Sequence, residues 1–358
     1  MDISFFNHNA FSMATMMKAI ENYAFKPDLI GSLNLFEEVE TNKTTVGIER
    51  RDNKLSLIPT SERGAPLIEA GRDSRNVRFF PTTRIAKSDT IKAEEIQDRR
   101  EFGTEDQLET AMKFIAKRQK NLIGEIELTW ENMQLGAIQG IVLDADGSVL
   151  YDWYKEWGIT PPEPIDFKLN EDTTDVSYMV NQIRIKMVKA SGNTFSTRSR
   201  IIGFCGDEFF FKLKNHKTIR ETYLNTSLAQ TLNSTAGIAT PGAIELGSFG
   251  SFDFAGATFV NYCNIHDYNM NTKSKTKRSI GIKPDECQFV PVNVPGVFQK
   301  TFAPGESWKV VNTVGKPLYP TLVIDRDNDA WVRAEVYSYP LFICARPEML
   351  FKAVVKAQ

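Results

Sequence analysis

Residues 44–96 carry short runs in which polar and apolar positions alternate, the pattern of strands rather than of helices. Runs at 44–49 and 54–58 flank Arg51-Asp-Asn53, and a third follows at 77–80. Ten basic and eight acidic residues are interleaved along this stretch. A lone two-stranded ribbon is marginally stable in water, so the pattern predicts an elongated hairpin arm that needs a neighbouring subunit. An ordinary surface hairpin packed on its own fold is the alternative.

A helical period dominates the region after the arm. Thr104 followed by Gln107 has the spacing of a capping box, and apolar residues then recur on one helix face for about thirty residues. At 1.5 Å per residue such a helix is roughly 45 Å long, which is typical of a structural spine and equally compatible with a long core helix. A shorter helix over 10–24, stopped by Pro27, precedes the arm. The residues of the long stripe are Leu108, Met112, Ile115, Leu122, Ile126, Trp130 and Met133.

Residues 139–151 form the clearest local pattern, because Asp146-Gly147 lies between two apolar runs. That dipeptide is typical of a primed turn, so we predict a β-hairpin. Asp144 and Asp146 resemble the start of a calcium-binding loop, which requires Gly at the sixth place and Glu at the twelfth. Val149 and Lys155 stand there instead, so no calcium site is predicted.

Beyond a Pro-rich boundary at 160–164 the pattern alternates between helical and extended segments, which predicts an α+β domain. A Lys-rich loop over 271–278 interrupts it, and we interpret this loop as solvated rather than as a phosphate contact. We predict helices over 174–190 and 206–225, and strands near 200–204, 252–263, 279–294, 319–324, 330–339 and 340–347.

Composition narrows the class of function. The 358 residues carry a formal net charge of −2, whereas a protein that grips nucleic-acid phosphates needs a clear excess of Lys and Arg. There is no apolar run of about 18 residues and no basic leader at the N-terminus, so no membrane segment is predicted. The four cysteines lack a CxxC spacing, which predicts reduced, mostly buried thiols rather than zinc ligands. They are Cys205, Cys263, Cys287 and Cys344.

Motifs for catalysis and cofactor binding are missing. The three histidines, His8, His216 and His266, lie far apart, and none has a carboxylate or cysteine at metal-ligand spacing. No G-x-S-x-G, P-loop, dinucleotide-binding or H-E-x-x-H motif occurs. We therefore predict no catalytic residues, no cofactor and no metal, while an active site built from carboxylates alone stays open.

Several short motifs occur in a fixed order along the chain. They are Leu35-Phe36, Thr44-Thr-Val46, Ile48-Glu49, Leu57-Ile58-Pro59, Arg63-Gly-Ala-Pro66, Arg78-Phe-Phe80, Ile91-Lys-Ala-Glu-Glu-Ile-Gln97, Asp144-Ala-Asp-Gly147 and Ser338-Tyr-Pro-Leu-Phe-Ile-Cys-Ala-Arg-Pro-Glu348. From about residue 28 to the C-terminus, their order and spacing resemble the lambda-type major capsid protein family of tailed bacteriophages, the phage major capsid protein E family.

The resemblance implies the α+β tailed-phage major capsid fold, also called the Johnson fold. It divides the chain into an N-terminal arm (1–43), an extended β-hairpin E-loop (44–96), a peripheral domain with a long spine helix and β-hairpin (97–164), an axial domain (165–317) and a return to the peripheral domain (318–358). The E-loop residues expected to contact neighbouring subunits are Glu49, Arg50, Glu62, Arg63, Glu69, Arg75 and Arg78.

By the same resemblance, the chain is expected to be the major capsid protein of a tailed double-stranded DNA bacteriophage or prophage. Copies would assemble in the host bacterial cytoplasm, as hexamers and pentamers, into the icosahedral head of the virion. The implied partners are other copies of the chain, a scaffolding protein, a portal, a decoration protein, and packaged DNA held by weak non-specific contact. An encapsulin-like compartment is one alternative, and a phage-encoded enzyme or DNA-binding protein is another.

Overall fold

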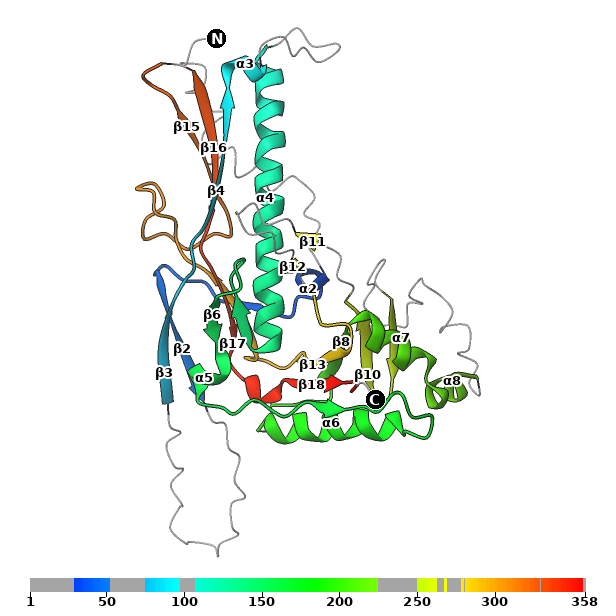
Figure 1. Ribbon diagram of the computed structural model, residues 1–358. Helices are drawn as coiled ribbons and strands as arrows, with labels where there is room; N and C mark the ends of the chain where they lie inside the picture. The colour runs from blue at the N-terminus through cyan, green and yellow to red at the C-terminus, as the bar shows by residue number, and fades with distance from the viewer. Residues whose placement is uncertain are drawn as a thin grey trace, which may run out of the picture.

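In the computed structural model the chain forms a narrow, upright wing joined to a wider α+β body (Figure 1). The structure describes residues 29–51, 75–96, 107–192, 194–224, 250–262, 267–268, 278–279, 281–328 and 330–356. The predicted helix over 10–24, the cap at Thr104, the run at 54–58 and residues 271–277 of the Lys-rich loop lie outside this part of the chain.

The wing consists of a long helix that lies along one face of a three-stranded antiparallel sheet (Figure 1). Helix α4 (Gln107–Gln139) has 33 residues, which at 1.5 Å per residue is about 50 Å. Its residues Ile115, Leu122 and Ile126 are buried, so the predicted helix and its apolar face are confirmed. The sheet order is β15 (Tyr319–Ile324), β16 (Trp331–Ser338) and β4 (Ile85–Lys92), and the short helix α3 (Ala93–Ile96) follows β4.

A first hydrophobic core lies where the C-terminal half of α4 meets two small sheets and the base of the arm. Phe36 packs there against Phe298 and Phe342, with ring centroids 5.3 and 5.7 Å away. The elements around this core are α2 (Leu29–Ser32), β1 (Glu37–Glu38), β2 (Thr45–Arg51), β3 (Arg75–Pro81), β5 (Ile141–Leu143), β6 (Val149–Asp152), α5 (Trp153–Trp157), β14 (Phe298–Phe302) and β17 (Pro340–Cys344).

The predicted hairpin over 139–151 is present as β5 and β6, but the prediction of a primed turn was wrong. The Gly147 N–H donates to the Asp144 carbonyl at 2.9 Å, and Gly147 has a φ of 86° whereas Asp146 does not have a positive φ. A type I turn followed by a glycine bulge therefore closes the hairpin. A separate register shift follows between Val142 and Leu143, which are opposite Tyr151 and Val149.

The body is a six-stranded mixed sheet that is covered on both faces. Because side chains alternate along a strand, Ile202 and Phe204 of the central strand β8 join the first core, whereas Ile201 and Cys205 join a second core with α6, α7 and α8. The sheet order is β7 (Ile165–Asp166), β18 (Phe351–Val354), β13 (Glu286–Val292), β8 (Arg200–Cys205), β10 (Ala257–Asn261) and β9 (Ser251–Phe254). The helices are α6 (Val176–Ala190), α7 (Asp207–Asn215), α8 (Lys217–Leu224) and the 3₁₀ helix η3 (Pro347–Met349). A separate two-stranded pair consists of β11 (Asp267–Tyr268) and β12 (Arg278–Ser279).

Two predictions for the body were wrong in detail. The single helix expected over 206–225 is broken at His216, whose extended backbone (φ −59°, ψ 138°) separates α7 from α8. The single strand expected near 252–263 is a hairpin, because Ala255 and Gly256 both have positive φ values, 51° and 78°, and so form a primed turn. The helix over 174–190 and the strand from residue 200 are confirmed.

Three of the four cysteines are buried as free thiols, as predicted. Cys205 and Cys287 are register partners on β8 and β13, and their sulfur atoms are 3.1 Å apart. Burial raises the pKa of the Cys287 thiol well above its ordinary value. Cys344 is the third, and Cys263 lies outside the described residues.

Candidate assembly arm

The predicted arm begins as an antiparallel ribbon of β2 and β3. Its seven register pairs run from Thr45 opposite Pro81 to Arg51 opposite Arg75. In Figure 1 the ribbon lies below the lower end of the wing and points in the direction opposite to that in which the wing rises. This ribbon, which we call the arm base, is continuous with residues 52–74, which lie outside the described part of the chain.

The arm base packs on its own subunit. Val46, Ile48 and Phe80 are 8%, 4% and 4% exposed and belong to the first core. Phe79, the residue before Phe80 on β3, is 71% exposed because it lies on the opposite face of the ribbon. The alternative of a hairpin packed on its own fold therefore holds for the arm base, where three apolar side chains hold it in place.

Aromatic side chains form the socket for Phe80. Its ring makes edge-to-face contacts with Trp153, Trp157 and Tyr151, at centroid distances of 5.2, 5.9 and 6.2 Å. The Tyr151 hydroxyl also donates to the Pro81 carbonyl, and burial raises the pKa of Tyr151. This socket was not predicted, although four aromatic residues within 151–157 are a visible signal in the sequence.

Arg78 adds a polar contact beside this socket. Its guanidinium donates to the Glu156 carbonyl, and Nη1 lies 3.6 Å from the Glu156 carboxylate. The same group lies 6.0 Å from the centre of the Trp157 ring. Within one chain, then, Arg78 fastens β3 to α5.

The other predicted contact residues divide into two groups. Glu49, Arg50 and Arg75 lie on the paired strands, where Glu49 is opposite Val77 and Arg50 is opposite Asn76. The structure thus brings these three and Arg78 together on one ribbon. Glu62, Arg63 and Glu69 lie outside the described residues.

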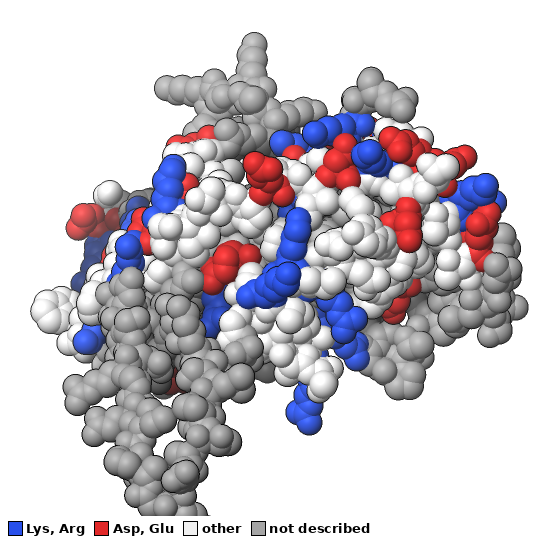
Figure 2. Space-filling model, turned by 90° about the horizontal axis from the view of Figure 1, so that it is seen from below, with Lys and Arg blue, Asp and Glu red and all other residues white. Residues whose placement is uncertain are grey.

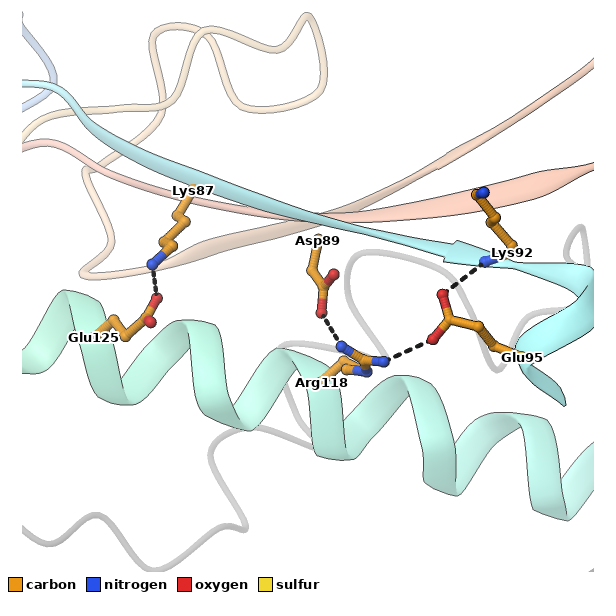
Figure 3. Close-up of polar contacts among 6 residues, drawn as sticks. All are labelled: Lys87, Asp89, Lys92, Glu95, Arg118 and Glu125. Carbon is orange, nitrogen blue, oxygen red and sulfur yellow. Dashed lines mark hydrogen bonds and ion pairs between the residues drawn. The ribbon is translucent and has the colours of Figure 1, made fainter. Parts of the chain in front are cut away.

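A seam of charges joins the wing helix to β4 (Figure 3). Arg118 of α4 donates from Nη1 to Asp89 at 3.0 Å and from Nη2 to Glu95 at 2.7 Å. Lys87, two residues before Asp89 on the same strand face, pairs with Glu125. Charge-assisted hydrogen bonds of this kind fix geometry as well as adding energy. The seam therefore fixes the orientation of the sheet on the part of α4 that lies outside the first hydrophobic core.

The opposite face of the wing sheet carries aromatic and charged side chains. On β16, Arg333 Nε lies 2.6 Å from Glu335 and is stacked 5.4 Å from the Trp331 ring. The Tyr337 hydroxyl donates to Glu335, and this hydrogen bond raises the pKa of Tyr337 to about 12. Arg84 lies 5.3 Å from the Tyr337 ring. Helix α4 covers the other face, where Ala334 and Val336 are fully buried.

The described residues hold no group of three or more His, Cys, Asp and Glu side chains arranged to bind a metal ion. Of the helices among them, none is both long and apolar enough to cross a membrane. The described residues do offer an arm base fixed by Phe80 and a wing sheet with charged and aromatic side chains opposite α4, which are features suited to contacts with other proteins.

Comparison with known families decides between the possible classes of protein. A family model described as phage major capsid protein E matches residues 12–355. The chain belongs to this family. The members most informative here are two curated proteins named major capsid protein. The chain is 26% identical over 362 residues to that of Salmonella phage Felix O1, covering 95% of each chain. It is 25% identical over 305 residues to that of Pseudomonas phage KPP10, covering 83% of this chain and 84% of the relative.

A solved structure shares the fold of this member of the phage major capsid protein E family. A prophage capsid protein from E. coli CFT073 superposes with a TM-score of 0.52 at 13% sequence identity, covering 79% of this chain and 80% of that one. At this identity the likeness shows the fold alone. The predicted α+β tailed-phage capsid fold is confirmed.

Proposed function

We propose that the chain is the shell-forming subunit of a tailed phage or prophage head, which self-assembles as hexamers and pentamers around double-stranded DNA. The observation that carries the proposal is the family match over 12–355. The geometry adds a physical reason: the arm base is anchored by Phe80 in its own subunit while β2 and β3 run outward from the body. An arm of this form can reach a neighbour without losing its own attachment.

We also propose a division of the chain into domains. We assign residues 44–96 to the E-loop, 97–164 with 318–358 to the peripheral domain, 165–317 to the axial domain and 1–43 to the N-terminal arm. The packing of α4 with β5 and β6 in the first core supports the peripheral assignment, and the packing of α6 and α7 in the second core supports the axial one. Residues of the two domains also share these cores, as Ile202 does in the first and Phe351 in the second. Residues Glu49, Arg50, Glu62, Arg63, Glu69, Arg75 and Arg78 are our candidates for contacts of the E-loop with other subunits.

Contact with packaged DNA is expected to be weak and independent of base sequence. The net charge is −2, and on the face seen from below, Lys and Arg are interspersed with Asp and Glu (Figure 2). Binding through counterion release needs a local excess of cations. We further propose a separate scaffolding protein, a portal and a decoration protein as partners, assembly in the bacterial cytoplasm, and no catalytic step.

Electron microscopy of negatively stained particles tests this proposal. The chain is expressed with and without the genes that neighbour it. Closed icosahedral shells formed in at least one of the two preparations would support it, and a chain that stays monomeric in both would contradict it. Shells that enclose a protein cargo, with no portal gene nearby, would indicate an encapsulin-like compartment instead.

A further inference from the structure

The link between β14 and β15 holds a tryptophan in solvent. Trp308 is 95% exposed, more than any other large hydrophobic side chain among the described residues. Val311 and Val314 follow at intervals of three residues and are 47% and 50% exposed. We call these three side chains the loop patch. The link is drawn in orange on the left of Figure 1, beside the wing sheet.

The loop that carries the patch is anchored on its inner side. Val310 packs against the buried cluster of Ala303, Tyr319 and Tyr339. The Ser307 carbonyl accepts hydrogen bonds from the N–H groups of Val310 and Val311, at 2.9 and 3.0 Å, so Trp308 lies on a closed turn. Since Val310 occupies the inward position, Trp308 is not a core residue displaced from its site.

Contacts at both ends of the loop also fix it to the rest of the subunit. Near its start, Glu306 lies 3.0 Å from Arg84, which is stacked on Tyr337 of the wing sheet. Near its end, the Gly315 N–H donates to the Thr41 carbonyl at 2.8 Å. A Cβ at Gly315 would lie 1.7 Å from the Phe302 carbonyl oxygen, so the chain passes too closely there for any other residue. The exposure of Trp308 is thus built into the fold.

We propose that the loop patch docks on a second copy of this chain and forms a subunit contact separate from the arm. The inference rests on the proposed function, because a shell subunit is surrounded mainly by copies of itself. Tryptophan, tyrosine and arginine are the residues enriched among binding hot spots, and a loop whose backbone is already fixed loses little backbone entropy when it binds. Standard interfaces bury about 800 Å² per partner, so three side chains are the anchor of a larger contact.

Charge around the patch favours a protein surface over a nucleic acid. The arginines of the adjoining sheet face are already paired, Arg84 with Glu306 and Arg333 with Glu335. A surface with these arginines paired, and with the loop lysines Lys309 and Lys316 left as its cations, falls short of the run of positive charge that phosphates need. It is complementary instead to a surface of mixed and nearly balanced charge, and a chain of net charge −2 presents such a surface.

The test compares two variants of the loop with the parent. Trp308→Ala removes the anchor, and Lys309→Ala, at the next exposed position of the same turn, removes a charge but little apolar area. Each is expressed with the neighbouring genes, checked by thermal melting and imaged by electron microscopy. Both variants should melt like the parent. The subunit concentration needed for shells should rise about 30-fold or more for Trp308→Ala, the effect of one hot spot, and stay unchanged for Lys309→Ala.

Hydroxyl-radical footprinting of the parent gives a second measurement that needs no variant. Oxidation of Trp308, read by mass spectrometry, should fall several-fold between free subunits and closed shells. The inference is overturned if parent shells form but Trp308 is oxidised as fast as in subunits, or if Trp308→Ala assembles like Lys309→Ala. It is also overturned if Trp308→Ala shells are normal but lose another head protein. A parent that forms no shells under any condition would overturn the proposed function itself.

Discussion

Phe80→Ala tests whether the arm base is part of the folded core. The ring is 4% exposed and contacts three aromatic side chains. Removal of a buried Phe side chain costs about 3–5 kcal/mol, and each aromatic pair contributes about 0.5–1.5 kcal/mol beyond its buried area. We expect the free energy of unfolding to fall by about 3–5 kcal/mol, since the socket is formed by rigid rings that cannot close over the cavity.

Urea unfolding followed by tryptophan fluorescence is the assay, because Trp153 and Trp157 line the socket and report on it directly. The matched control is Phe79→Ala, one residue away on the same strand and 71% exposed. A surface substitution of this kind changes stability by about 0.5 kcal/mol or less. Equal unfolding midpoints for the two variants would refute the assignment of Phe80 to the core and of Phe79 to the free face.

Three further predictions concern the wing and the body. Leu122→Ala, at a buried position of α4, should lower the free energy of unfolding by about 2–5 kcal/mol, and thermal melting of the soluble subunit would show it. Arg118→Ala leaves Asp89 and Glu95 without their shared cation. The free energy of unfolding should fall by about 1–2 kcal/mol, between the values for exposed and buried ion pairs. Lys117→Ala, at an exposed position of the same helix, is the control, and equal melting temperatures for the two variants would contradict the role of the seam. Burial alone raises the pKa of the Glu286 carboxyl, but hydrogen bonds from Lys352 and Lys283 outweigh it and lower the pKa. Its contribution is therefore fully present above the unfolded-state pKa of about 4.3 and is lost as the pH falls through the folded-state value. Glu286→Gln should accordingly be less stable than the parent at pH 7, by up to about 1 kcal/mol, and equally stable below the folded-state pKa; a difference that persists in acid would contradict the pairing.

The sequence patterns predicted the helices and strands whose form depends on residues close together in the chain. The stripe containing Ile115, Leu122 and Ile126 keeps one helical face over many turns, and α4 follows it. The Asp-Gly pair marked the hairpin of β5 and β6, although the turn type depended on a bulge that composition does not reveal. The arm was predicted as extended because its runs alternate, which β2 and β3 confirm on the described residues.

Features that depend on distant partners were missed. Strands β14 and β18 pair with segments far along the chain, so no neighbouring turn marks them. Phe79 and Phe80 are chemically identical, and only the docking of β3 on α5 decides which one is buried. The partners of Arg118 are 29 and 23 residues away in the sequence. The exposure of Trp308 likewise follows from Val310 filling the adjacent cluster.

Deletion of the arm beyond its base tests the central claim most directly, namely that the arm serves assembly while its base serves folding. Arg51 and Arg75 are register partners, so an Asn-Gly link between them can replace residues 52–74 and close the ribbon with a two-residue turn. The variant retains Phe80 and its aromatic socket. It should melt cooperatively at the temperature of the parent, yet form no closed shells under the electron microscope when it is expressed with the neighbouring genes. Normal closed shells from the deleted chain, or a chain that fails to fold, would contradict the account.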